Sequence, residues 1–250
     1  MIRHVILFDI DGTLISTGGA GRRAMERAFE KVHGLRGALR NFNLGGRIDG
    51  QIYAEIVARK HEPDRLHAYR EAYFNFLCEG LGERPSRGKL LPGVVPLLER
   101  LADRHDTLVG LLTGNWREGA RLKLEHYGIW RFFAFGAFGD DADERPRLPA
   151  VAKARARAVA PGGISDKLTR FFVIGDTPRD IECAQASGCI AVAVASGDYS
   201  RQALAGWTPH LLFDSLADTG RVCDRLFQDT GATEWNWTPI FDRFRKCEVF

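Results

Sequence analysis

The chain of 250 residues carries 35 basic and 32 acidic side chains, a formal net charge of +3, and 45% hydrophobic residues. The hydrophobic content argues against a disordered chain, and the balanced charge gives no reason to expect a nucleic-acid or membrane partner. The five cysteines are odd in number and show no C-x-x-C pair, which argues against a disulfide framework and a zinc site. Because no leader or long apolar segment is visible, we expect a cytoplasmic protein with reduced thiols.

Short apolar runs recur along the chain and predict buried parallel strands, since strands covered on both faces do not alternate. The first run spans residues 5–8, and later ones span 107–112, 170–174, 190–195 and, more weakly, 210–213. Helical periodicity lies between these runs, at 94–104, 117–127, 149–160 and 178–187. Strands that alternate with helices of this length indicate crossover units in a parallel sheet, so the predicted core is α/β.

One long stretch interrupts this alternation. Residues 20–82 are helical in pattern and contain no convincing strand, which is too much helix for a single crossover. We therefore predict a helical cap domain at 16–85, inserted into an α/β core domain formed by 1–15 and 86–250. The aromatic segment 234–250 lacks clean periodicity, and we expect it to pack on the core or on another subunit.

Polar residues follow three of the predicted strands, at the point where each strand ends. Asp9 and Asp11 follow the first strand, a Thr-Gly-Asn triplet at 113–115 follows the second, and Asp176 follows the third. Ligands of open parallel sheets bind at the carboxyl ends of the strands, so these residues meet at one edge. Carboxylates there repel each other by roughly 4 kcal/mol per close pair at an effective dielectric of about 20, and a divalent cation removes the conflict. Hard oxygen ligands favour Mg²⁺.

The two aspartates of the first strand can divide the work of phosphoryl transfer. Asp9 and Asp11 are two residues apart in an extended segment, so both carboxylates can approach one ligand from the same side. An ionised carboxylate can attack phosphorus and form an aspartyl-phosphate, while its neighbour donates a proton to the leaving group and later takes one from water. The hydroxyl of Thr113 and the N–H groups of Gly114 and Asn115, at the entry to a helix, suit an anionic phosphate.

Three motifs, DIDGTL, LLTGN and VIGDTPRD, resemble the first, second and fourth motifs of the haloacid dehalogenase superfamily of phosphohydrolases. The resemblance covers about residues 5–216, and the layout is similar to the phosphoglycolate-phosphatase-like branch with its helical cap. It implies a Rossmann-like parallel sheet, Asp9 as nucleophile and Asp11 as general acid/base. It also implies a Mg²⁺ site formed by Asp9, Asp176 and the main-chain oxygen of Asp11. Asp180 is implied as a supporting carboxylate of that site.

The third motif departs from the family's pattern. A lysine normally stands before a proline there, whereas this chain reads DERPR at 143–147 and has no lysine before Lys153. Arginine keeps the charge and adds bidentate contacts to phosphate, so we hypothesise that Arg145 takes the role. Arg22, Arg23 and Arg47 could reach an anionic substrate from the cap side, although surface arginines on helices more often face solvent. The candidate substrate-binding residues are Gly12, Gly114, Asn115, Arg22 and Arg47.

The leading hypothesis is a Mg²⁺-dependent phosphatase that acts on a small phosphorylated metabolite, with no nucleic-acid or membrane partner. A phosphomutase would use the same aspartates and differ in the acceptor, and a phosphate-binding protein with weak catalysis is favoured only by Arg145. A dehalogenase is disfavoured because such enzymes lack the second aspartate. A receiver domain is disfavoured because its phosphorylated aspartate ends a strand midway along the chain, whereas Asp9 ends the first strand. The helical insertion also has no counterpart in a receiver domain. The sequence names neither the natural substrate nor the oligomeric state.

Overall fold

The computed structural model describes residues 1–83 and 87–228. Within these ranges, six parallel strands form one sheet in the order β5-β4-β1-β6-β7-β8. These strands are β1 (His4–Phe8), β4 (Thr107–Leu112), β5 (Phe135–Ala137), β6 (Arg170–Gly175), β7 (Ile190–Val194) and β8 (Leu211–Phe213). The predicted α/β core with a parallel sheet is confirmed, and each predicted apolar run forms a strand. The first strand lies at the centre of the sheet, between β4 and β6.

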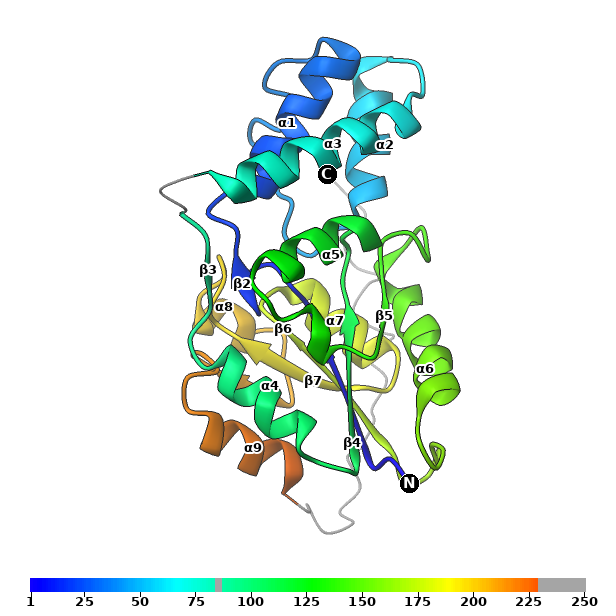
Figure 1. Ribbon diagram of the computed structural model, residues 1–250, viewed down its shortest axis with the longest axis vertical. Coiled ribbons are helices and arrows are strands. Elements are labelled where there is room, and N and C mark those ends of the chain that lie inside the picture. The colour runs from blue at the N-terminus through cyan, green and yellow to red at the C-terminus, as the bar shows by residue number, and fades with distance from the viewer. Residues whose placement is uncertain (84–86, 229–250) are drawn as a thin grey trace, which may run out of the picture.

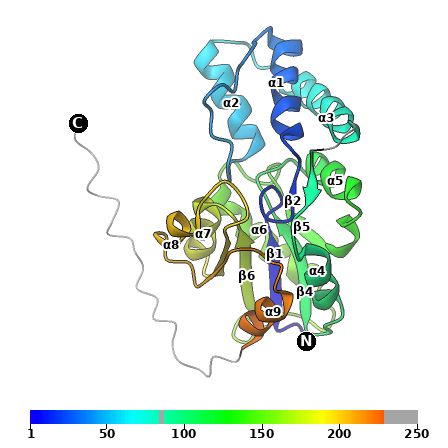
Figure 2. The ribbon, with the colours of Figure 1, turned by 90° about the vertical axis from the view of Figure 1, so that its left-hand side faces the viewer.

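Helices cover both faces of the sheet (Figure 2). On one face lie α4 (Val94–Ala102), α5 (Arg117–His126) and α9 (Thr219–Phe227), and on the other lie α6 (Leu148–Val159), α7 (Pro178–Ala186) and α8 (Arg201–Ala205). Short 3-10 turns occur at Trp130–Phe132 and Arg145–Arg147. Successive side chains of β1 point to opposite faces, so Ile6 and Phe8 pack in one core cluster and Val5 and Leu7 in the other. Burial on both faces explains why this strand is apolar throughout.

Three helices stand together beyond the carboxyl edge of the sheet (Figure 1). They are α1 (Ala20–His33), α2 (Asp49–Lys60) and α3 (Leu66–Gly82), and we call residues 20–82 the cap helices. They share an aromatic core of their own, in which the ring centroids of Phe29 and Tyr69 are 4.5 Å apart. The chain passes to and from them through two paired antiparallel strands, β2 (Ile15–Ser16) and β3 (Lys89–Leu90). The predicted domain boundary at 15/16 falls inside β2, and the one at 85/86 lies outside the described residues.

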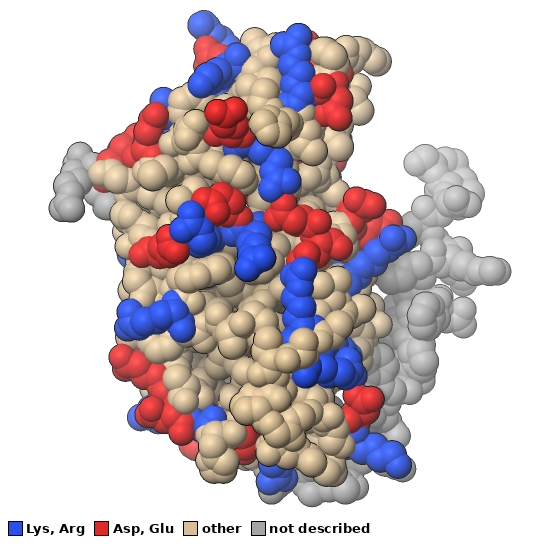
Figure 3. Space-filling model, turned by 45° about the vertical axis from the view of Figure 1, so that its right-hand side comes forward, with Lys and Arg blue, Asp and Glu red and all other residues tan. Residues whose placement is uncertain are grey.

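Basic and acidic side chains are interspersed over the face shown in Figure 3. None of the helices in the described ranges is long and apolar enough to cross a membrane. The described cysteines, Cys78, Cys183, Cys189 and Cys223, are free thiols. Cys247 and the aromatic segment 234–250 lie outside the described part of the chain.

Candidate active site

A tight turn after β1 brings Asp9 and Asp11 against the loop after β6. Gly12 adopts a φ of +82°, in the left-handed region that glycine enters at little cost. A Cβ at this position would overlap the carboxylate of Asp176, so the turn requires glycine for a second reason. The neighbouring Thr13 donates a hydrogen bond from its hydroxyl to Oδ1 of Asp176 at 3.0 Å. The DIDGTL sequence therefore builds both the turn and a support for an aspartate 163 residues away.

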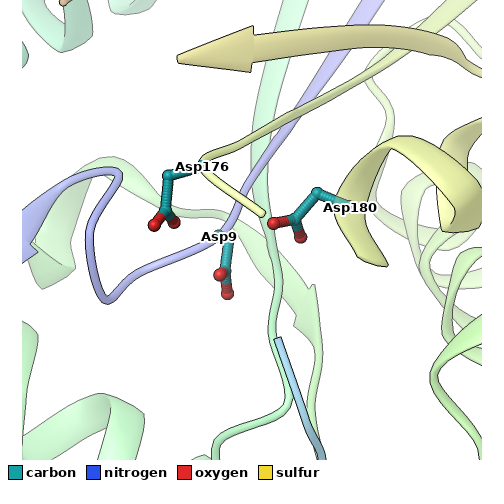
Figure 4. A group of neighbouring side chains, drawn as sticks. All are labelled: Asp9, Asp176 and Asp180. Carbon is teal, nitrogen blue, oxygen red and sulfur yellow. The ribbon is translucent and has the colours of Figure 1, made fainter. Parts of the chain in front are cut away.

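The first turn of α7 fixes Asp180 beside the other carboxylates. Pro178 occupies the first helical position, where its missing N–H is not needed, and Oδ2 of Asp180 accepts the N–H of Thr177 at 3.0 Å and its hydroxyl at 2.7 Å. Figure 4 shows Asp9, Asp176 and Asp180 side by side, from the loops after β1 and β6 and from the start of α7. One carboxylate oxygen of each lies within 4.8 Å of the other two.

The electrostatics of this buried trio suit a cation. Burial raises the pKa of Asp9 to about 6, the guanidinium of Arg145 opposes the shift, and the charges of Asp180 and Asp11 add to it. Burial together with the charges of Asp180 and Asp9 raises the pKa of Asp176 well above its ordinary value. A divalent ion between the carboxylates would remove this repulsion, and a donor set made only of oxygen fits a hard cation. The buried aspartates are therefore suited to a divalent metal.

Arg145, which the sequence predicts to replace the third-motif lysine, is buried beside Asp180 and Asp9. Its Nη2 is 2.5 Å from Oδ1 of Asp180 and 3.4 Å from Oδ1 of Asp9, and its Nη1 donates to the carbonyl of Gly46 at 3.1 Å. Burial by itself would lower the pKa of Arg145, but the carboxylates of Asp180 and Asp9 raise it by more. The pKa is therefore above its ordinary value, and the guanidinium stays charged. Lys153 instead donates to a main-chain carbonyl just after α7 at 2.6 Å. In the described part of the chain, the cation paired with the predicted nucleophile is thus an arginine.

The loop after β4 holds Asp11 through its asparagine. Nδ2 of Asn115 donates to Oδ2 of Asp11 and to Oγ1 of Thr113, each at 2.9 Å. The N–H of Asn115, which the sequence predicts to bind phosphate, donates instead to Oγ1 of Thr113 at 3.3 Å. Asn115 therefore acts on Asp11 through its side chain. Lys123 completes the group, because its Nζ donates to Oδ2 of Asp11 and to Oδ1 of Asn115, both at 2.6 Å.

Two buried charged residues of this site, Lys123 and Asp49, are not predicted from the sequence. Lys123 lies in the buried stripe of α5 with Ala120 and Leu124, and a lysine in such a stripe is the signal that could have revealed it. Asp49 begins α2, where an acidic residue passes as an ordinary helix start. In the structure Oδ2 of Asp49 accepts the N–H of Trp116 at 2.9 Å, and burial raises the pKa of Asp49 to about 7. Asp49 therefore links the cap helices to the loop that carries Asn115.

A cavity of about 390 Å³ lies between the cap helices and the carboxyl edge of the sheet. Among the predicted site residues, those that line it are Asp9, Asp11, Gly12, Arg22, Arg47, Thr113, Gly114, Asn115, Arg145 and Asp176. Asp180 is buried and is not part of the lining, and both of its oxygens bind neighbouring protein groups. Both cap arginines already have protein partners. The exposed Arg22 donates to the carbonyls of Leu39 and Phe42, and the half-buried Arg47 pairs with a glutamate of α2.

Known proteins resemble this chain in sequence and in fold. A phosphoglycolate phosphatase of Synechococcus elongatus is 32% identical over 140 residues, which are 56% of this chain and 62% of that protein. A phosphoglycolate phosphatase of Mesorhizobium japonicum is 27% identical, over 92% of this chain and 100% of that protein. The solved structure of a haloacid dehalogenase-like family hydrolase from Streptococcus pneumoniae has the same fold, with a TM-score of 0.65, 19% identity and coverage of 89% of this chain and 98% of that one.

The family of this protein is shown by a family model that matches most of the chain. A model of the haloacid dehalogenase-like hydrolase family matches residues 6–185, a range that contains Asp9, Asp11, Asp176 and Asp180. The parallel sheet and the aspartates at its carboxyl edge agree with that match. The chain therefore belongs to the haloacid dehalogenase-like hydrolases.

Proposed function

We propose that this hydrolase is a phosphatase that cleaves a small phosphate monoester through an aspartyl-phosphate on Asp9, with Mg²⁺ as its cofactor. The observation that carries the proposal is the buried group of Asp9, Asp176 and Asp180, with Asp9, Asp176 and the neighbouring Asp11 lining one cavity. A cavity of about 390 Å³ suits a small molecule. The curated relatives named as phosphoglycolate phosphatases support a small phosphorylated metabolite as the substrate class. Free buried thiols support action in the cytoplasm.

The residues that would hold Mg²⁺ are Asp9, Asp176 and the main-chain oxygen of Asp11. Asp180 supports the site rather than binding the ion directly, since its two oxygens hold Arg145 and Thr177. When bound, Mg²⁺ would neutralise the carboxylates and the negative charge that develops on the phosphate oxygens.

The chain's own residues perform the two chemical steps. In the first, the carboxylate of Asp9 bonds to phosphorus while the bond from phosphorus to the leaving-group oxygen breaks, and Asp11 gives its proton to that oxygen. In the second, Asp11 takes a proton from a water molecule that attacks phosphorus, and the bond from Asp9 to phosphorus breaks to release inorganic phosphate. The hydroxyl of Thr113 and the N–H of Gly114 orient the phosphate oxygens, and Arg145 balances their charge.

The cap helices complete the site from the other side. Arg22 and Arg47 line the cavity opposite the aspartates, in reach of an anionic substrate, although each already has protein partners. Burying the substrate beneath the cap helices excludes bulk water, which strengthens the interaction of fixed charges with the phosphoryl group.

The test is release of inorganic phosphate from p-nitrophenyl phosphate, with Mg²⁺ and with a chelator. We expect metal-dependent turnover in the wild type and a loss of at least about 1000-fold in Asp9→Asn. Asp143→Asn is the matched control, because Asp143 is an exposed aspartate outside the cavity lining, and it should keep wild-type turnover. Equal turnover in Asp9→Asn and the wild type would overturn the proposal. Transfer of the phosphoryl group between sugar hydroxyls without phosphate release would assign a phosphomutase instead.

A further inference from the structure

A closed ring of three hydrogen bonds joins Lys123, Asn115 and Asp11. The ammonium of Lys123 bonds both of the others at 2.6 Å, and Nδ2 of Asn115 bonds Oδ2 of Asp11 at 2.9 Å. Both donors converge on the same carboxylate oxygen, Oδ2. The side chain of Lys123 is 5% exposed, whereas that of Asp11 is 41% exposed. A buried cation therefore holds the more exposed Asp11 at the edge of the cavity, together with Asn115.

The fold explains how a residue so far along α5 reaches the site. Asn115 lies in the loop before this helix, and Lys123 is two helical turns further on, on the face that packs against the core with Ala120 and Leu124. Side chains of a helix point back toward its N-terminus, so the long stem of Lys123 runs toward the loop and delivers the ammonium to Asp11. The ring thereby links two loops at the carboxyl ends of neighbouring strands, β1 and β4.

The two buried cations of the site have separate partners. Arg145 bonds Asp180 and lies 3.4 Å from Asp9, on the side of the carboxylate trio. Lys123 bonds Asp11, the carboxylate proposed to move protons. This division indicates that Lys123 does not duplicate the role of Arg145.

We propose that Lys123 is a positioning residue for Asp11. By fixing Oδ2 together with Asn115, it presents Oδ1 of Asp11 to the leaving-group oxygen and then to the attacking water. The proposal rests on the proposed function, because it requires Asp11 to act as the general acid and base. It assigns to Lys123 an effect on proton transfer and no direct contact with the phosphate.

A double-mutant cycle tests the proposal. The variants are Lys123→Met, which keeps most of the length of the side chain and removes the charge, Asp11→Asn, and the two combined. We expect Lys123→Met to lower kcat by about 10- to 100-fold with KM nearly unchanged, and to add less than about 2-fold in the Asp11→Asn background. The loss should be larger for glycerol 2-phosphate than for p-nitrophenyl phosphate, because an alkoxide needs a proton more than a nitrophenolate does. Inhibition by inorganic phosphate should stay within about 2-fold of the wild type.

The control is Arg121→Met, which removes a cation from the same helix. Arg121 is paired with Glu118 and Glu125 at 2.7 Å on the exposed side, so its loss should leave kcat unchanged. If Lys123→Met does not fold, Lys123→Gln carries the test, since its amide can still donate to Asp11 and only part of the activity should be lost. Equal losses from Lys123→Met in both backgrounds, or a weakening of phosphate inhibition by about 10-fold or more, would overturn the proposal. Failure of the proposed function is separate, because it shows as full turnover in Asp9→Asn.

Discussion

Contact between the cap helices and the loop after β4 leaves no space for a side chain at Gly114. A Cβ there would lie 1.9 Å from the carbonyl oxygen of Arg47, and the N–H of Asp49 already donates to the carbonyl of Gly114 at 2.9 Å. To reach the 3.4 Å at which ordinary van der Waals contact begins, the segment from Arg47 to Asp49 must retreat by about 1.5 Å. We predict that Gly114→Ala holds the cap helices away from the aspartates of the sheet edge.

The expected loss follows from the size of this displacement. A misplacement of about 1 Å in a catalytic arrangement costs on the order of 100-fold in rate, so kcat/KM of Gly114→Ala should fall by about 100-fold or more. The strands and their packed helices lie outside the disturbed contact, so the protein should still unfold in a cooperative thermal transition. The assay is steady-state hydrolysis of p-nitrophenyl phosphate, with thermal unfolding followed by circular dichroism.

The same substitution at Gly119 is the matched control. A Cβ at Gly119 would meet the ring and hydroxyl of Tyr73 at 3.5 Å, an ordinary contact, and the position lies within α5. Gly119→Ala should therefore keep activity and stabilise the helix by about 0.5–1 kcal/mol. If Gly114→Ala keeps more than half of the wild-type kcat/KM, close approach of the cap helices to this loop does not support catalysis, and the reasoning is wrong.

Three further predictions concern charge and metal. Mg²⁺ at 100 times its Kd should raise the free energy of unfolding of the wild type by about 2.7 kcal/mol, measured by thermal unfolding, and should not stabilise Asp176→Asn. Equal stabilisation of both proteins would place the metal elsewhere. Without metal, Arg145→Met should lower the free energy of unfolding in urea by about 3–5 kcal/mol because buried carboxylates lose their cation, whereas the exposed Arg147→Met should change it by less than about 1 kcal/mol. The folded pKa of Asp49, about 7, lies above its unfolded value of 3.8, so this group reduces stability increasingly as the pH rises from about 4 to 7. From pH 5 to pH 8, the stability of Asp49→Asn relative to the wild type should rise by about 2.6 kcal/mol in urea unfolding, and a difference independent of pH would contradict the shift.

The centre of the sheet could be predicted from the sequence because its strands are buried on both faces. That burial makes β1, β4 and β6 continuous apolar runs, which stand out from the helices between them. The edge strand β5 was missed because it has three residues, Phe135–Ala137, one of them a glycine, and no apolar run of useful length. The helix α9 was missed although Val222 and Leu226 have helical spacing, because it follows the last predicted strand and no further strand marks its end.

The aspartates of the site could be predicted for a related reason. Asp9 and Asp176 follow strands directly, so the order of the strands in a parallel sheet brings them together. Lys123 and Asp49 have no such marker, because one reaches the site from within a helix and the other arrives with the cap helices. Their placement depends on how α5 and α2 pack against the sheet edge, which a single sequence does not specify.

The central claim is a covalent bond between Asp9 and phosphorus, and the most direct measurement is chemical trapping of that intermediate. The enzyme would be mixed with p-nitrophenyl phosphate and Mg²⁺, quenched in acid and treated with borohydride, which reduces an acyl phosphate to an alcohol. Mass spectrometry of the peptide that contains Asp9 should then find homoserine at that position, in the wild type and more strongly in Asp11→Asn, where hydrolysis of the intermediate is slowed. An unmodified Asp9 during active turnover, or homoserine at another aspartate, would contradict the account.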